Sequence, residues 1–140
     1  MKKEEMFDLM NSTMVMHLAT VEGDQPHVRG MLLFRADESG IVFHTGDFKD
    51  VFSQIEANPK AEVCFSKNGV QLRVKGTLVR DEDPELRKEI FAHPSRKFLK
   101  EWEKSGTQFN LIVYRMVHCE AKVWTMDKNF EKSEWVKITE

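Results

Sequence analysis

The sequence predicts a mainly β protein in which six or seven strands form a closed or partly closed barrel, with helices at its ends and between strands. Two observations lead to this expectation. Short apolar runs with alternating polarity recur along the chain, and turn-forming residues such as Gly, Asn and Asp separate them. One of the longest runs also contains Gly76, which favours a bulge or bend of the kind that a strand needs when it curves into a barrel.

The 140 residues fit one domain, residues 1–140, because no linker, repeat or low-complexity segment divides them. The formal net charge of −2 is small and both signs are scattered, so we expect no nucleic-acid partner. The charged, amphipathic opening lacks the apolar core of a signal peptide, and no stretch approaches the ~20 apolar residues of a membrane span. We therefore expect a cytoplasmic protein with no membrane partner.

The cysteines and histidines indicate no metal chemistry. Cys64 and Cys119 each lie in an apolar, strand-like run, where a thiol usually behaves as a small buried hydrophobe. The five histidines are dispersed without the spacing of metal ligands, and the chain has no nucleophile elbow, P-loop or zinc-protease motif. The sequence therefore predicts no metal site, and the catalytic residues stay unknown.

The first part of the chain predicts a helix followed by an antiparallel hairpin. Met6, Leu9 and Met10 share one face of the opening helix. Alternating polarity predicts a strand from Met14 to Val21 and a second strand from His27 to Arg35, across a short polar turn.

The stretch from Gly40 to Asn58 predicts a buried strand, a tight turn and a helix. The turn is expected at His44–Thr45–Gly46, and the helix is expected to open at Asp47 and to bury Phe48, Val51, Phe52 and Ile55. A helix N-terminus after a glycine turn presents free backbone N–H groups and favours negative charge, as in a phosphate site. An ordinary strand-to-helix connection capped by Asp47 is the alternative.

The rest of the chain predicts more strands and two short helices between them. The expected strands are Ala61–Ser66, Val70–Val79, Phe109–Met116 and Glu120–Met126, with a short closing strand at Trp135–Ile138. Asp83 and Pro84 predict the start of one helix that runs to about His93, and Pro94 predicts a second helix that ends near Ser105–Gly106.

Three stretches, in this order and spacing, resemble a known family. They are MHLATVEGDQPHVRGMLLF from Met16, GIVFHTGDFKDVFSQIEANPKAEVCF from Gly40, and VQLRVKG from Val70. Together they are similar to the opening hairpin, the flavin turn and helix, and the following strand of the pyridoxamine 5'-phosphate oxidase-like FMN-binding split barrels. The general-stress or nitroimidazole-resistance-like branch is the best match. The likeness covers residues 14–80 well and the C-terminal third loosely.

The resemblance implies a split β-barrel homodimer with FMN in two symmetric clefts between the subunits. Arg29 and Lys49 would bind the phosphate, joined by Thr45 and the backbone amides around His44. The backbone near Met31 and Leu32 would run along the edge of the flavin ring. Gln71 would reach the flavin or its ribityl chain, and Trp124 would lie near the ring at the dimer cleft.

Each of these residues also has a purely structural interpretation. Arg29 on a strand can cover apolar surface with its stem, and Lys49 can be a solvated helix charge. Gln71 can be a surface strand residue, and Trp124 can belong to the core. His44 can be a packed turn histidine, and a role for it in proton transfer is left open.

Departures from the family pattern bear on the reaction. The resemblance places a lysine of the true oxidases at Phe34 and an Arg-Lys pair at Asp50–Val51, and the end of the chain lacks their Arg and His motif. Oxidation of pyridoxamine phosphate is therefore not expected. The resemblance implies an FMN-dependent oxidoreductase with an unknown small-molecule redox substrate. The alternatives are a non-catalytic flavin or haem module that acts as carrier, sensor or electron relay, and a structural dimer without a working site.

Overall fold

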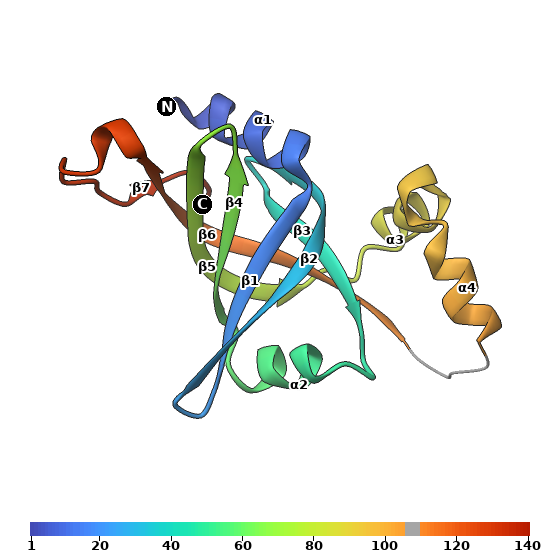
Figure 1. The fold of residues 1–140 in the computed structure, drawn as a ribbon. Helices are drawn as coiled ribbons and strands as arrows, with labels where there is room; N and C mark the ends of the chain where they lie inside the picture. Colours follow the sequence, from blue (N-terminus) through green and yellow to red (C-terminus); the bar gives the residue numbers. More distant parts are fainter. Residues whose placement is uncertain (106–109) are drawn as a thin grey trace.

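The computed structural model describes residues 1–105 and 110–140. These residues form seven strands, four α-helices and two short 3-10 helices (Figure 1). In chain order the elements are α1 (Lys3–Thr13), β1 (Val15–Glu22), β2 (Gln25–Asp37), β3 (Gly40–Gly46), α2 (Asp50–Ala57), β4 (Lys60–Lys67), β5 (Val70–Arg80), α3 (Pro84–Ala92), η1 (Pro94–Arg96), α4 (Phe98–Lys104), β6 (Leu111–Thr125), η2 (Met126–Lys128) and β7 (Val136–Lys137).

The strands form one antiparallel sheet that closes on itself. Their order is β3-β2-β1-β4-β5-β6-β7, and an additional pairing of β3 with β6 closes β1 to β6 into a barrel. β7 pairs with β6 as an extra strand. The prediction of a mainly β barrel with peripheral helices is confirmed.

The barrel is filled by the apolar residues that alternate along its strands. Met16 and Leu18 of β1 and Val63 and Phe65 of β4 are fully buried, as the period of two predicts. Helix α1 lies across one end of the barrel and α2 lies at the other end (Figure 1). Residues of α1 belong to the same core cluster, so this helix covers the apolar interior. Cys119 is buried as expected, whereas Cys64 is half-buried.

A second, smaller core forms outside the barrel, where α3 and α4 pack against β3 and β6. It consists of Val42, Leu86, Ile90, Leu99, Leu111 and Val113. The predicted start of α3 is confirmed, because the Asp83 side chain accepts a hydrogen bond from the Glu85 backbone N–H at 2.9 Å. The second predicted helix is split into η1 and α4, and α4 ends at Lys104 with Ser105 as its C-cap, close to the predicted end; Gly106 lies outside the described residues.

The two strands predicted on either side of His118–Cys119 are wrong, because β6 is a single strand of 15 residues. The start predicted at Phe109 lies outside the described residues. His118 has φ of 54°, and the pairing with β5 continues through it with a shift of register between Lys75 and Thr77. The predicted irregularity at Gly76 is therefore confirmed, but the extra residue lies in β6, opposite this glycine.

The start predicted for α2 is also wrong. The three residues His44–Thr45–Gly46 are the buried end of β3, and the helix begins at Asp50 with Lys49 as its N-cap. Asp47 does not cap this helix, because its carboxylate accepts hydrogen bonds from the backbone N–H and the side-chain amide of Asn110. Phe48, which we expected to be buried, is 49% exposed.

The described helices include none that is long and apolar enough to cross a membrane. Within the same residues there is no group of three or more His, Cys, Asp or Glu side chains that could hold a metal ion.

Substitution of Gly76 tests the bulge. A Cβ atom at this position would lie 2.7 Å from the Val117 carbonyl oxygen and 2.7 Å from Cγ of Met116. We expect Gly76→Ala to lower the free energy of unfolding by about 1–3 kcal/mol, as overpacking does. The control is Gly30→Ala, because a Cβ atom there meets nothing within 4 Å. Chemical denaturation of both variants measures the difference, and equal stabilities would contradict the packing argument.

Candidate functional site

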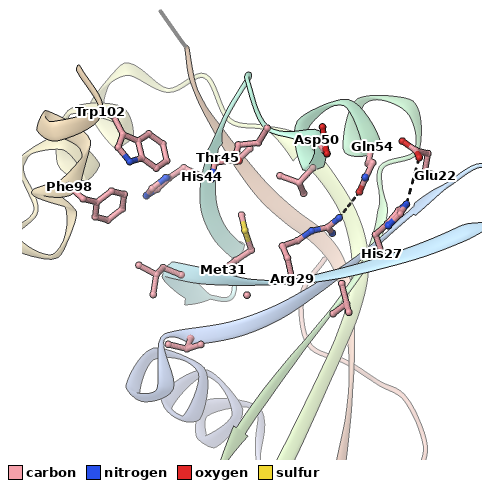
Figure 2. A pocket seen from close by; sticks show the side chains of 16 residues that line it. Glu22, His27, Arg29, Met31, His44, Thr45, Asp50, Gln54, Phe98 and Trp102 are labelled. Atoms are coloured by element: carbon pink, nitrogen blue, oxygen red, sulfur yellow. Dashed lines mark hydrogen bonds and ion pairs between the residues drawn. The ribbon is translucent and has the colours of Figure 1, made fainter. Parts of the chain in front are cut away.

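A cleft of about 870 Å³ opens on one side of the barrel, within the usual size range of ligand sites (Figure 2). Its walls come from β2, the end of β3, the start of α2 and the inner face of α4. Six of the eight cofactor residues predicted from the sequence line it: Arg29, Met31, Leu32, His44, Thr45 and Lys49.

The cleft exists because β2 and β3 separate. They pair through four residue pairs, from Leu33–Phe43 to Asp37–Gly40, with a shift of register after Leu33. β3 then continues alongside β6 as far as the Gly46–Leu111 pair. In the described part of the chain, the first eight residues of β2 thus have a strand neighbour, β1, on one side only.

The free side of β2 presents backbone hydrogen-bonding groups to the cleft. The Leu33 N–H donates to the Met14 carbonyl oxygen at 2.8 Å, so it points toward β1. Because backbone groups alternate in direction along an antiparallel strand, those of Leu32, Gly30 and Val28 point away from β1. They form a row of donors and acceptors along the wall of the cleft.

At one end of the cleft, Arg29 of β2 is held by neutral groups. Its guanidinium donates to the Leu18 carbonyl oxygen at 3.2 Å, to Thr20 Oγ1 at 2.7 Å and to Gln54 Oε1 at 2.5 Å. Thr20 also donates to Gln54 Oε1 at 2.7 Å, so the amide oxygen accepts twice. Burial lowers the pKa of Arg29. No carboxylate of the described residues forms an ion pair with it, although the carboxylates of Glu22 and Asp50 line the same cleft.

At the other end of the cleft, His44 of β3 is buried and paired with a second arginine. The Arg96 Nε–H donates to His44 Nε2 at 2.8 Å, and Arg96 also donates to the Leu33 carbonyl oxygen at 2.8 Å. Burial and the Arg96 charge lower the pKa of His44 from 6.5 to about 4, so the ring is neutral at pH 7. His44 Nδ1 is buried without a hydrogen-bond partner among the described residues.

Aromatic side chains from α4 complete this second end. Phe98 and Trp102 line the cleft with ring centroids 5.5 Å apart, and the Phe98 ring centroid lies 6.2 Å from that of His44. Lys49 does not project freely, because its ammonium lies 5.5 Å and 5.7 Å from the ring centroids of Phe48 and Trp102. The cleft is therefore polar near Arg29, where Asp50 and Glu22 also lie, and aromatic near His44 (Figure 2).

Gln71 and Trp124 are not brought to this cleft. They face each other as cross-strand partners on β5 and β6, away from the residues that line it. The Trp124 indole N–H donates to the Asn129 side chain at 2.9 Å. A single chain does not bring Gln71 and Trp124 to the cleft, so their contact with a cofactor stays a prediction.

Sequence reasoning missed four residues of the site. Gln54 follows Val51 by three residues and precedes Ile55, so helical periodicity alone places this polar side chain on the buried face of α2. Phe98 and Trp102 were expected on a helix, but nothing local indicated that their side chains would line a cleft. The burial of Arg96 had no signal, because an arginine in a Pro-Ser-Arg turn is ordinarily exposed.

Comparison with known proteins gives a family match over most of the chain. The family model described as pyridoxamine 5'-phosphate oxidase matches residues 3–124. The chain is 31% identical over 101 residues to pyridoxine/pyridoxamine 5'-phosphate oxidase from Rhodopseudomonas palustris (strain TIE-1), covering 70% of this chain and 48% of that protein. The chain thus spans about half the length of the curated relatives that it matches.

Solved structures with the same fold include proteins of different names. A NimC/NimA family protein from Clostridium acetobutylicum is similar with a TM-score of 0.74 and 25% identity, over 96% of this chain and 91% of that one. General stress protein 26 from Bacillus anthracis has a TM-score of 0.71 and 21% identity, over 96% and 97%. A heme binding protein from Mycobacterium smegmatis has a TM-score of 0.68 and 16% identity, over 96% and 57%.

The low pKa of His44 predicts a pH dependence of stability. The ring stays neutral in the folded protein down to about pH 4, whereas in the unfolded chain it binds a proton below about 6.5. Protonation therefore favours unfolding. The stability that the neutral His44 ring contributes is present above pH 6.5 and is lost as the pH falls toward 4. Between pH 7 and pH 5 we expect a loss of about 2 kcal/mol from this group.

The measurement is the free energy of unfolding of the wild type and of His44→Asn at both pH values. The variant keeps a polar side chain but cannot titrate in this range, so its stability should fall less. Equal losses in the two proteins would contradict the assignment.

Proposed function

Because the chain belongs to the pyridoxamine 5'-phosphate oxidase family of split barrels, which is a flavin-binding family, we propose that it is an FMN-dependent oxidoreductase. The flavin would occupy the cleft between β2 and β3. The observation that carries the proposal is the Arg29 guanidinium, which forms no ion pair with a described residue and lies beside the free edge of β2.

The end of the cleft that holds Arg29 suits the phosphate of FMN. Arg29 is already oriented by Thr20 and Gln54, and a dianionic phosphate would supply the ion-pair partner that Arg29 does not have among the described residues. Thr45 lines the same cleft, and Lys49 precedes the first turn of α2. Lys49 would need to leave the rings of Phe48 and Trp102 to reach the phosphate, so we expect Arg29 to contribute more than Lys49 to phosphate binding.

The free edge of β2 suits the ring system of the flavin. The backbone groups of Gly30 and Leu32 can pair with polar atoms at the rim of a planar ring, while the Met31 side chain offers an apolar contact. When bound, FMN supplies the redox chemistry, and the protein orients it and excludes water.

A homodimer would bring Gln71 and Trp124 to the flavin from the partner subunit. Members of this family are typically dimeric. The outer face of the β1–β2 hairpin supports the same arrangement here, because Val15, Val28 and Leu32 are 51%, 69% and 40% exposed. Leu33 of the same hairpin, by contrast, is fully buried in the core.

The substrate is proposed as a small redox-active molecule, but not as pyridoxamine phosphate. Phe34, at the position where the resemblance implies a lysine, packs edge-on against His93, with ring centroids 5.5 Å apart. It lies beside the Arg96 guanidinium, which is 5.4 Å from its ring centroid. An aromatic side chain here cannot bind phosphate as a lysine would.

The second candidate is a non-catalytic module that binds flavin or haem. The structural similarity to a heme binding protein suggests this candidate. Haem iron needs an axial ligand. His44 is poorly suited because its Nε2 already accepts a hydrogen bond from buried Arg96, whereas His27 lines the same cleft with its Nε2 3.7 Å from the Glu22 carboxylate. Because the family is flavin-binding, we favour flavin over haem. Reduction of the bound flavin by a nicotinamide cofactor would separate an oxidoreductase from a carrier.

Substitution of the cleft cations tests the phosphate assignment. We expect Arg29→Ala to weaken FMN binding about tenfold or more, from the ~1.5–3 kcal/mol of a charge-assisted hydrogen bond. Lys49→Ala should act in the same direction with a smaller effect. Quenching of flavin fluorescence measures the dissociation constants. The matched control is Arg35→Ala, on the same strand but ion-paired with Glu89 outside the cleft; unchanged affinity in both cleft variants would overturn the assignment.

Substitution of Val28 tests the proposed dimer. A carboxylate on this exposed face would be buried unpaired at an interface, so Val28→Asp should give a monomer in analytical ultracentrifugation and weaken FMN binding. Val79→Asp, at another exposed valine on β5, serves as the control. A wild type that is monomeric yet binds FMN tightly would contradict the two-subunit site.

A further inference from the structure

Arg96 is a buried cation surrounded by neutral partners. It is 1% exposed, and its three acceptors are His44 Nε2, the Leu33 carbonyl oxygen and the Ser95 hydroxyl. In the part of the chain described here, no carboxylate forms an ion pair with it. Burying a charge without a counter-ion is costly, and an apolar side chain of similar size would avoid that cost. The arrangement therefore calls for an explanation beyond packing.

The hydrogen bond from Arg96 fixes the tautomer of His44. A guanidinium can only donate, so His44 Nε2 must be the accepting, unprotonated nitrogen. In the neutral ring the proton then lies on Nδ1. This N–H is buried and lacks a partner among the described residues, although His44 lines the cleft. A buried donor without a partner destabilises the protein, and an acceptor on a ligand would remove that cost.

We infer that His44 Nδ1–H is a dedicated hydrogen-bond donor to an acceptor atom of the flavin ring, and that Arg96 is the positioning residue that keeps His44 in this tautomer. The inference rests on the proposed function and adds to it a specific role for the aromatic end of the cleft. Figure 2 shows His44 beside Phe98 and Trp102, across the cleft from Arg29 and Gln54. If the phosphate binds at Arg29, the ring is left to the end where His44 lies.

The donor is not a proton source. A neutral imidazole N–H gives up its proton only with great difficulty, and the guanidinium beside it opposes a second proton on the ring. The arrangement instead directs the positive end of the Nδ1–H dipole at the ligand, which favours electron density on the acceptor atom. Since Nδ1 is covered in this structure, binding has to displace a neighbouring side chain, and Phe98 is the aromatic neighbour.

The first test reads the tautomer without any cofactor. Long-range ¹H–¹⁵N correlation spectra of the wild-type protein at pH 7 should show His44 protonated at Nδ1. Arg96→Met removes the donor and should let the Nε2–H form appear. A wild-type ring protonated at Nε2 would overturn the inference, whether or not Arg96→Met folds.

The second test separates the two ring nitrogens by their amide mimics. In His44→Asn the amide nitrogen occupies the place of Nδ1, whereas in His44→Gln it occupies that of Nε2. We expect His44→Asn to bind FMN within about twofold of the wild type and His44→Gln to bind about five- to tenfold more weakly, the equivalent of one neutral hydrogen bond. Equal affinity of both variants and the wild type would overturn the inference.

Lumiflavin, which has the ring but no phosphate, distinguishes this inference from the proposed function. His44→Gln should weaken lumiflavin and FMN by the same factor, and Arg29→Ala should weaken FMN alone. If Arg29→Ala weakens FMN while both His44 variants behave as the wild type with either ligand, the proposed function stands and this inference fails. If the wild type binds neither ligand, the proposed function fails, and the role of His44 toward flavin fails with it.

Discussion

The site depends on the point at which β2 and β3 stop pairing. β3 pairs with β2 on one edge through four residues and with β6 on its other edge through six, so among the described residues the end of β3, His44–Gly46, has β6 alone as a strand neighbour. The shift of register after Leu33 marks the point at which they part. Everything that makes the cleft usable follows from this separation: a free strand edge, an inward-facing arginine on β2 and a histidine at the far end of β3.

Charge is distributed unevenly around this cleft. Arg29 and Arg96 are both held by neutral acceptors, while most other arginines of the chain lie in surface ion pairs such as those of Arg35, Arg73 and Arg80. Surface pairs contribute little to stability, whereas a desolvated cation without an anion is unfavourable. Arg29 lines one end of the cleft and buried Arg96 supports His44 at the other, which is consistent with a ligand that brings negative charge and hydrogen-bond acceptors.

The sequence predicted the barrel well because its signals are local. Alternation and the Asp83–Pro84 helix start each depend on neighbouring residues, and each is found in the structure. It failed where a distant partner decides. In the sequence Asp47 has the features of a helix cap, but its carboxylate accepts hydrogen bonds from Asn110 instead. The helix therefore starts at Asp50, three residues later than predicted. The break expected at His118 is a bulge, because β5 continues to pair on both sides of it.

The residues of the candidate site also divide into those with a local signal in the sequence and those whose place depends on distant partners. The pattern from Arg29 to Leu32 and from His44 to Lys49 could be identified because it lies in two continuous stretches. Gln54 could have been found from its place on the apolar face of α2. Arg96 could not, because its burial depends on the packing of a short turn against β2 and β3. Gln71 and Trp124 remain unexplained within one chain, and a second subunit is the simplest way to give them a role.

The central claim is that the cleft between β2 and β3 holds a flavin nucleotide. A crystal structure of the protein grown with excess FMN tests it most directly. The account predicts a phosphate within hydrogen-bonding distance of Arg29 and a flavin ring along the free edge of β2. A cleft that stays empty, or FMN bound elsewhere on the barrel, would contradict it.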